Sequence, residues 1–136
     1  MIELSALQPF FIALALGALV GLEREYARYK KRGHDYAGIR TFPLIALFGA
    51  LAAFMGNKIS MWILVTSILL VGGLILIAYF MLAKKGFSAV GATSEMAGFI
   101  TFFVGILTYY QEYILAIIIT IILTLILYAR SLLHHF

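Results

Sequence analysis

The chain has 136 residues, of which 64% are hydrophobic and 12% are charged, and its mean hydropathy is +1.06. A soluble domain carries about 45–50% apolar and about 25% charged residues, so too little polar surface remains here to cover a globule in water. The length leaves no room for a catalytic domain beside the membrane segments, and the absence of cysteine excludes disulfides and thiolate metal sites. The net charge of +4 does not indicate nucleic-acid binding, because the basic residues lie between apolar segments.

Five apolar segments follow one another along the chain, and a spanning helix needs roughly 20 such residues. We expect helices over Leu4–Leu22, Thr41–Met55, Met61–Leu82, Ala92–Tyr110 and Tyr113–Leu133. The first helix should continue through Glu23 until Gly33 stops it. Thr41 is the expected N-cap of the second helix, with Pro43 in its first turn. The sequence therefore predicts an all-α fold, in which residues 1–136 form a single domain, a polytopic transmembrane bundle of about five helices.

The positive residues predict the orientation of this bundle. If five helices alternate in direction, nine of the ten Lys and Arg residues lie on one side, and only Lys58 lies on the other. The positive-inside rule then places the N-terminus outside and the C-terminus inside. Glu3 is the only charged residue before the first apolar run, so we expect no cleaved signal peptide. The predicted location is the inner cell membrane, with multiple passes.

Small residues recur at helical spacing and indicate which faces pack together. They allow helix backbones to approach closely in lipid. The glycines expected at helix contacts are Gly17, Gly21, Gly49, Gly98 and Gly105. On the first helix we expect the face formed by Ala13, Gly17 and Gly21 to continue to Glu25. The fifth helix is rich in Ile and Leu on all sides, which predicts a peripheral position.

Glu95 stands inside an apolar segment, where a charge is costly and usually faces the bundle interior, a partner or an aqueous cavity. The predicted topology also places three polar groups at one cytoplasmic level. They are Glu23, Arg24 and Glu25 on the first helix, Arg40 and Thr41 on the second, and Thr93, Ser94 and Glu95 on the fourth. These side chains form the candidate site.

Two interpretations of this cluster stay open. In a structural one, Arg24 and Arg40 pair with Glu25 and Glu95, and Thr93 or Ser94 caps the fourth helix. In a functional one, a hydrated cation or a proton binds there, and Mg²⁺ needs only one or two carboxylates because it keeps several waters. The expected ligands are Glu95, Glu23, Glu25 and Thr93, and the expected positioning residues are Arg24, Arg40, Thr41 and Ser94. The arginines weaken the functional interpretation, because they compete for the carboxylates. A bound Mg²⁺ is the one cofactor considered.

Three segments resemble elements of the MgtC/SapB family of membrane proteins. They are GLERE at residues 21–25, AGIRT at residues 37–41 and GATSEMA at residues 91–97. The last resembles a branch in which this domain is fused to a second membrane half of unknown function. That half, the soluble C-terminal domain of better-known members and the glycine-rich stretch of their third helix are missing from this sequence. Gly72 and Gly73 stand in place of that stretch.

The resemblance implies a role in ion homeostasis, because the family is associated with growth at low magnesium. We expect magnesium-linked cation transport, by this chain or as a subunit of a transporter. The alternative is a non-transporting regulator that docks on another membrane complex. No nucleophile–base motif is present, so an enzyme is not expected. The expected partners are the lipid bilayer and either a second copy in a homodimer or a second membrane subunit, and not nucleic acid.

Overall fold

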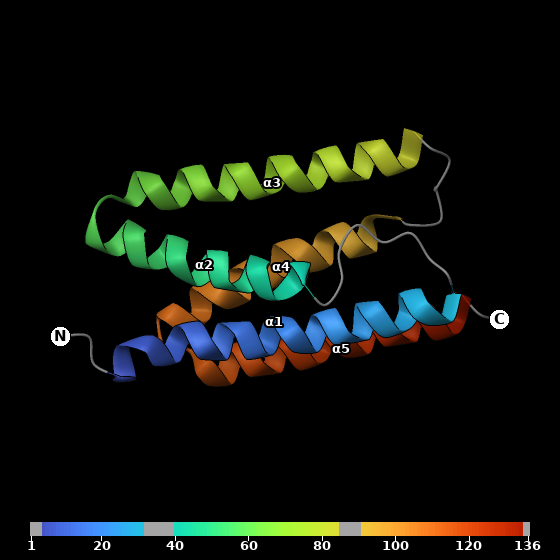
Figure 1. Cartoon of the computed structure of the whole chain (residues 1–136), viewed down its shortest axis with the longest axis horizontal. Coiled ribbons are helices and arrows are strands. Elements are labelled where there is room, and N and C mark those ends of the chain that lie inside the picture. The colour runs from blue at the N-terminus through green and yellow to red at the C-terminus, as the bar shows by residue number, and fades with distance from the viewer. Residues whose placement is uncertain (1–3, 32–39, 85–90, 135–136) are drawn as a thin grey trace.

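The computed structural model describes residues 4–31, 40–84 and 91–134. This part of the chain consists of five α-helices without a β-strand (Figure 1). The helices are α1 (Leu4–Lys31), α2 (Thr41–Lys58), α3 (Met61–Lys84), α4 (Gly91–Tyr109) and α5 (Tyr113–His134). The predicted all-α architecture and its five helices are confirmed. Gly33, the expected stop signal of the first helix, lies outside the described residues.

The helices α1, α2 and α4 pack against one another and form the centre of the bundle. The helix α3 contacts only α2 and α4 among the described helices, whereas α5 contacts only α1 and α4. Figure 1 shows the two outer helices on opposite sides, with α3 above and α5 below the central three. The predicted peripheral position of the fifth helix agrees with this arrangement, and α3 is peripheral as well.

The lengths of the helices suit a bilayer. Segments Ala6–Tyr26, Thr41–Lys58 and Met61–Met81 are long and apolar enough to cross a membrane, whereas Met96–Tyr109 and Tyr113–Ala129 are shorter apolar stretches. Large apolar side chains point outward from the bundle, including Leu69 on α3 and Ile114 on α5, which are 70% and 76% exposed. Hydrocarbon solvates such a surface, while the helices satisfy their own backbone hydrogen bonds.

The helices α2 and α4 are held at very short distance by two glycines that face each other's backbones. A Cβ atom at Gly49 would fall on the carbonyl oxygen of Phe102, and one at Gly105 would fall on the carbonyl oxygen of Ala46. Both contacts are with backbone, which cannot turn aside as a side chain can. Only glycine therefore fits at these two positions of the α2–α4 contact.

A similar contact joins α1 to the start of α2. A Cβ atom at Gly17 would lie 2.6 Å from the carbonyl oxygen of Phe42, which is closer than real Cβ contacts. Gly21 and Gly98 are also buried in the bundle. In contrast, a Cβ atom at Gly73 of α3 would meet nothing within 4 Å. Small residues thus lie where the central helices approach one another closely, whereas Gly73 lies on α3 at the edge of the bundle and faces open space.

The inward face of α1 differs from the expected one. Ala13, Gly17, Val20 and Arg24 are buried, while Glu25 is only half-buried. The expectation that Glu25 continues this face was wrong. A spacing of four residues drifts by about 40° per step on a helix with 3.6 residues per turn. After three such steps the face has moved, and Arg24 takes the inward position.

The start of α2 also differs by one residue from the expectation. Its N-cap is Arg40, whose side chain makes no capping hydrogen bond, and Thr41 is the first helical residue rather than the cap. Pro43 is compatible with either register, because the first four N–H groups of a helix lack an intrahelical partner. The proline signal therefore places this helix start without fixing its exact residue.

Candidate functional site

The three predicted polar groups lie on helix turns at the edge of one apolar layer. This layer is formed by Val20 of α1, Phe42 of α2, Ala97 of α4, and Leu123 and Leu127 of α5. The next turn of α1 holds Glu23 and Arg24. On α2 and α4, Arg40 and Glu95 each precede the layer by two residues. The three helix ends therefore meet at one level of the bundle, as the topology predicted.

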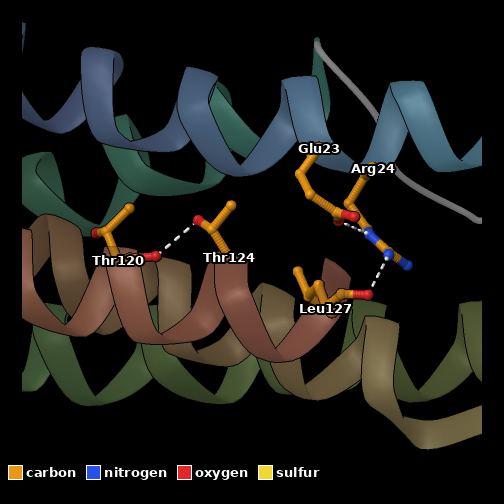
Figure 2. Close-up of polar contacts among 5 residues, drawn as sticks. All are labelled: Glu23, Arg24, Thr120, Thr124 and Leu127. Atoms are coloured by element: carbon orange, nitrogen blue, oxygen red, sulfur yellow. Dashed lines mark hydrogen bonds and ion pairs between the residues drawn. The ribbon is translucent and has the colours of Figure 1, made fainter. Parts of the chain in front are cut away.

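Glu23 and Arg24 form an ion pair inside the bundle (Figure 2). The Nε–H of Arg24 donates to Oε1 of Glu23 at 2.8 Å. Arg24 is 2% exposed and the Glu23 side chain 7% exposed. Successive residues of a helix ordinarily point to different sides, but both of these side chains extend into the seam between α1 and α5 (Figure 2). Their opposite charges compensate each other where neither reaches bulk water.

Arg24 also links α1 to α5. Its Nη2 donates to the backbone carbonyl of Leu127 at 3.5 Å (Figure 2). This distance is at the long end for a hydrogen bond, so the contact orients the guanidinium more than it strengthens the bundle. The sequence could not have predicted it, because every residue offers a backbone carbonyl and no side-chain signal marks Leu127.

The second oxygen of the Glu23 carboxylate is the least satisfied atom of the site. Its Oε2 is buried and has no hydrogen-bond partner within the described part of the chain. Leaving a buried acceptor unpaired costs about 1–3 kcal/mol, and more when the group is charged. Buried polar atoms of this kind usually bind a water or an ion or serve a chemical role. The free lone pairs of Oε2 can therefore bind a cation or take up a proton.

The hydroxyl protons of Thr120 and Thr124 beside this seam, and of Thr101 on α4, need no external partner. The hydroxyl groups of Thr120 and Thr124 on α5 donate to the carbonyls of Ala116 and Thr120 at 2.8 and 2.7 Å (Figure 2). Thr101 of α4 donates to the carbonyl of Ala97 at 2.7 Å. Each hydroxyl therefore satisfies its proton within its own helix, and only its oxygen lone pairs remain available to the interior.

The other predicted site residues occupy less buried positions. Glu25 and Thr41 are half-buried, and Arg40 is exposed. The structural interpretation assigned Glu25 and Glu95 to the arginines, whereas the described ion pair of Arg24 is with Glu23, a partner that this interpretation had omitted.

The predicted residues of α4 are placed by their helix alone. This helix begins at Gly91, so Thr93 and Ser94 lie within its first turn. The expectation that one of them is the N-cap was wrong, because the helix starts earlier than the apolar run. The side chains of Thr93, Ser94 and Glu95 lie outside the described part of the structure. Glu95 itself stands on α4 just before the apolar layer that contains Ala97.

A metal site is not complete among the described side chains. No group of three or more His, Asp or Glu residues lies together in that part of the chain. Oε2 of Glu23 could supply one hard oxygen ligand, but Arg24 already neutralises this carboxylate. A divalent cation would need a further carboxylate, and Glu25 on α1 and Glu95 on α4 are the candidates at this level. Carboxylates from these helix ends would together provide the oxygen ligands that Mg²⁺ prefers.

Comparison with known proteins identifies the family. Residues 10–136 match the model of the MgtC family, which is nearly the whole chain. Comparisons with curated proteins and with solved structures find no match. The GLERE and AGIRT segments that suggested the resemblance lie within the matched range. Together with its apolar helices, this match shows that the chain is a membrane protein of the MgtC family.

Proposed function

We propose that the chain serves ion homeostasis as a magnesium-linked cation transporter or as a subunit of one. The observation that supports this proposal is the buried Oε2 of Glu23, which has no partner among the described residues. The cation binds where α1, α4 and α5 meet, with Glu23, Glu25 and Glu95 as carboxylate ligands and Thr93 as a hydroxyl ligand. Arg24 orients Glu23, while Arg40, Thr41 and Ser94 complete the polar surroundings.

The charge at the site decides what it can bind. The Glu23–Arg24 pair is neutral, Glu25 and Glu95 add two negative charges, and Arg40 offsets one of them, so the cluster carries a net charge of −1. Mg²⁺ dehydrates reluctantly and is often bound through one or two carboxylates with several waters retained. A partly hydrated Mg²⁺ therefore suits a cluster at the edge of the apolar layer better than a dry cage inside it.

Five helices leave little room for an ion path within one protomer. Two described grooves of the bundle are lined mainly by apolar side chains, with Thr41 as the polar exception in one and Lys84 as the charged exception in the other. We therefore propose a parallel homodimer or an assembly with a second membrane subunit. Catalysis of a chemical reaction is not part of this proposal.

Flux measurements in proteoliposomes test the transport function. We expect Mg²⁺ uptake, followed with an enclosed Mg²⁺-sensitive dye, to fall at least tenfold in Glu23→Gln and Glu95→Gln. The matched control is Glu112→Gln, because Glu112 is exposed in the turn between α4 and α5. Uptake that is unchanged in both site variants would remove the cluster from the pathway.

A second candidate function is a non-transporting regulator that docks on another membrane complex. It is favoured by the internal compensation of Glu23 by Arg24, which also contacts Leu127, because such a pair can serve purely to hold helices together. This function predicts stoichiometric co-purification with a membrane complex and no flux from the pure protein. Flux from the pure protein that depends on Glu95 would exclude it.

A further inference from the structure

An apolar groove of about 450 Å³ runs between α2 and α3. Its described lining includes Leu44 and Phe48 of α2 and Val71 and Leu74 of α3. Thr41, at the start of α2, supplies the one polar side chain among these lining residues. The groove lies between two of the three segments that are long and apolar enough to span a membrane. Its walls therefore face hydrocarbon rather than water.

The end of this groove at Thr41 carries positive charge. Arg40 directly precedes Thr41, is exposed, and makes no capping hydrogen bond to α2. Lys84 is exposed at the end of α3. The start of α2 and the end of α3 lie toward the same end of the bundle (Figure 1). The groove thus ends next to Arg40, and Lys84 lies toward the same end of the bundle.

The geometry points to a glycerophospholipid with an anionic headgroup as the occupant of this groove. One acyl chain lies between α2 and α3, and the phosphate lies beside Arg40. The lining is apolar apart from Thr41, which suits an acyl chain, and the exposed Arg40 next to Thr41 suits an anionic headgroup.

Charge complementarity decides which headgroup is preferred. A Lys or Arg near an anionic membrane surface contributes about 1 kcal/mol of attraction, which corresponds to about a fivefold preference. We therefore expect phosphatidylglycerol to occupy the groove about fivefold more strongly than phosphatidylcholine with the same chains. The groove shares Thr41 with the surroundings proposed for the cation, and its headgroup contact shares Arg40, so the test below measures lipid contact and not ion flux.

Tryptophan fluorescence tests the site, because Trp62 is the only tryptophan of the chain. In a Trp62→Phe background, Leu44→Trp places a reporter at the groove, and its 62% exposure allows a larger ring. The matched control is Leu51→Trp, seven residues further on the same side of α2, 43% exposed and outside the described lining. Quenching is measured with phosphatidylglycerol and phosphatidylcholine that carry brominated acyl chains.

We expect the fivefold preference for the anionic lipid at position 44 and none at position 51. Arg40→Gln should abolish the preference at position 44, whereas Lys58→Gln, at the opposite end of α2, should leave it unchanged. Equal quenching by both lipids at position 44, or the same preference at both positions, overturns the proposal. Weak quenching by either lipid at position 44 also overturns it, since a second copy of the chain would then fill the groove.

Discussion

The guanidinium of Arg24 lies 2.8 Å from the carboxylate of Glu23, and both side chains are buried although they are neighbours in sequence. Charges at membrane depth usually pair with one another or with backbone carbonyls. Arg24 does both, because it also contacts the carbonyl of Leu127. The pair makes a charged helix turn compatible with the bundle interior. It leaves Oε2 of Glu23 without a hydrogen-bond partner among the described residues, so this oxygen can bind a cation or a proton.

Removal of Arg24 alone should destabilise the bundle strongly. In Arg24→Met the Glu23 carboxylate stays buried without this partner, and breaking a buried pair in this way typically costs about 3–5 kcal/mol. The free energy of unfolding, measured by SDS titration in mixed micelles, should fall by that amount. The double variant Glu23→Gln/Arg24→Met should lose much less, because no uncompensated charge remains. A double variant at least as unstable as Arg24→Met would contradict the buried-pair account.

The glycines between α2 and α4 should not tolerate a methyl group. In Gly105→Ala the new Cβ meets the carbonyl oxygen of Ala46, and in Gly49→Ala it meets that of Phe102, so the helices must separate. Such overpacking costs typically about 1–3 kcal/mol, which unfolding in mixed micelles would detect. Gly73→Ala is the matched control, since its Cβ meets nothing within 4 Å. It should keep stability or raise it by up to about 1 kcal/mol. Equal losses at all three positions would refute the close α2–α4 contact.

The opposite end of the bundle is joined by a polar contact between α2 and α4. The side-chain amide of Asn57 donates to the hydroxyl oxygen of Tyr109 at 3.0 Å, and the ring of Tyr109 also packs edge-on against Phe54. Tyr109→Phe keeps the ring and removes the acceptor, so we expect a loss of about 0.5–1.5 kcal/mol in thermal unfolding in detergent. Tyr110→Phe, at the neighbouring exposed position, should be neutral. Identical melting of both variants would argue against this contact.

The orientation predicted from Lys and Arg can be measured with single cysteines, since the chain has none of its own. Tyr26→Cys and Lys84→Cys should react with a membrane-impermeant maleimide only from the cytoplasmic side. Lys58→Cys and Glu112→Cys should react only from the outside. All four positions are exposed. Labelling of positions 26 and 84 from opposite sides would mean that the helix ends do not share one membrane surface.

The positions of the helices could be predicted from the sequence, because runs of apolar residues bounded by charged and turn residues form few structures other than membrane helices. The predicted start at Met61 for α3 and at Tyr113 for α5 agrees with the structure. The apolar layer of Val20, Phe42 and Ala97 could likewise be anticipated, since alternating helices bring these ends to one level.

The details of the site could not be predicted in the same way. Which α1 residue faces inward depends on the phase of the helix, and a shift of one residue turns the face by about 100°. That shift replaces Glu25 by Arg24 at the inward position. The pairing of Arg24 with Glu23 depends on rotamers, and its contact with Leu127 depends on how closely α5 packs against α1. Neither leaves a signal in the pattern of residue types.

Infrared difference spectroscopy of the purified protein tests most directly whether Glu23 takes up the cation. Adding Mg²⁺ should shift carboxylate stretching bands, and this shift should be lost in Glu23→Gln and kept in Glu112→Gln. Ca²⁺ at the same concentration serves as a second probe of ion preference. If Mg²⁺ leaves the carboxylate bands unchanged, or if Glu23→Gln retains the full shift, Glu23 does not bind the ion and its pair with Arg24 is structural.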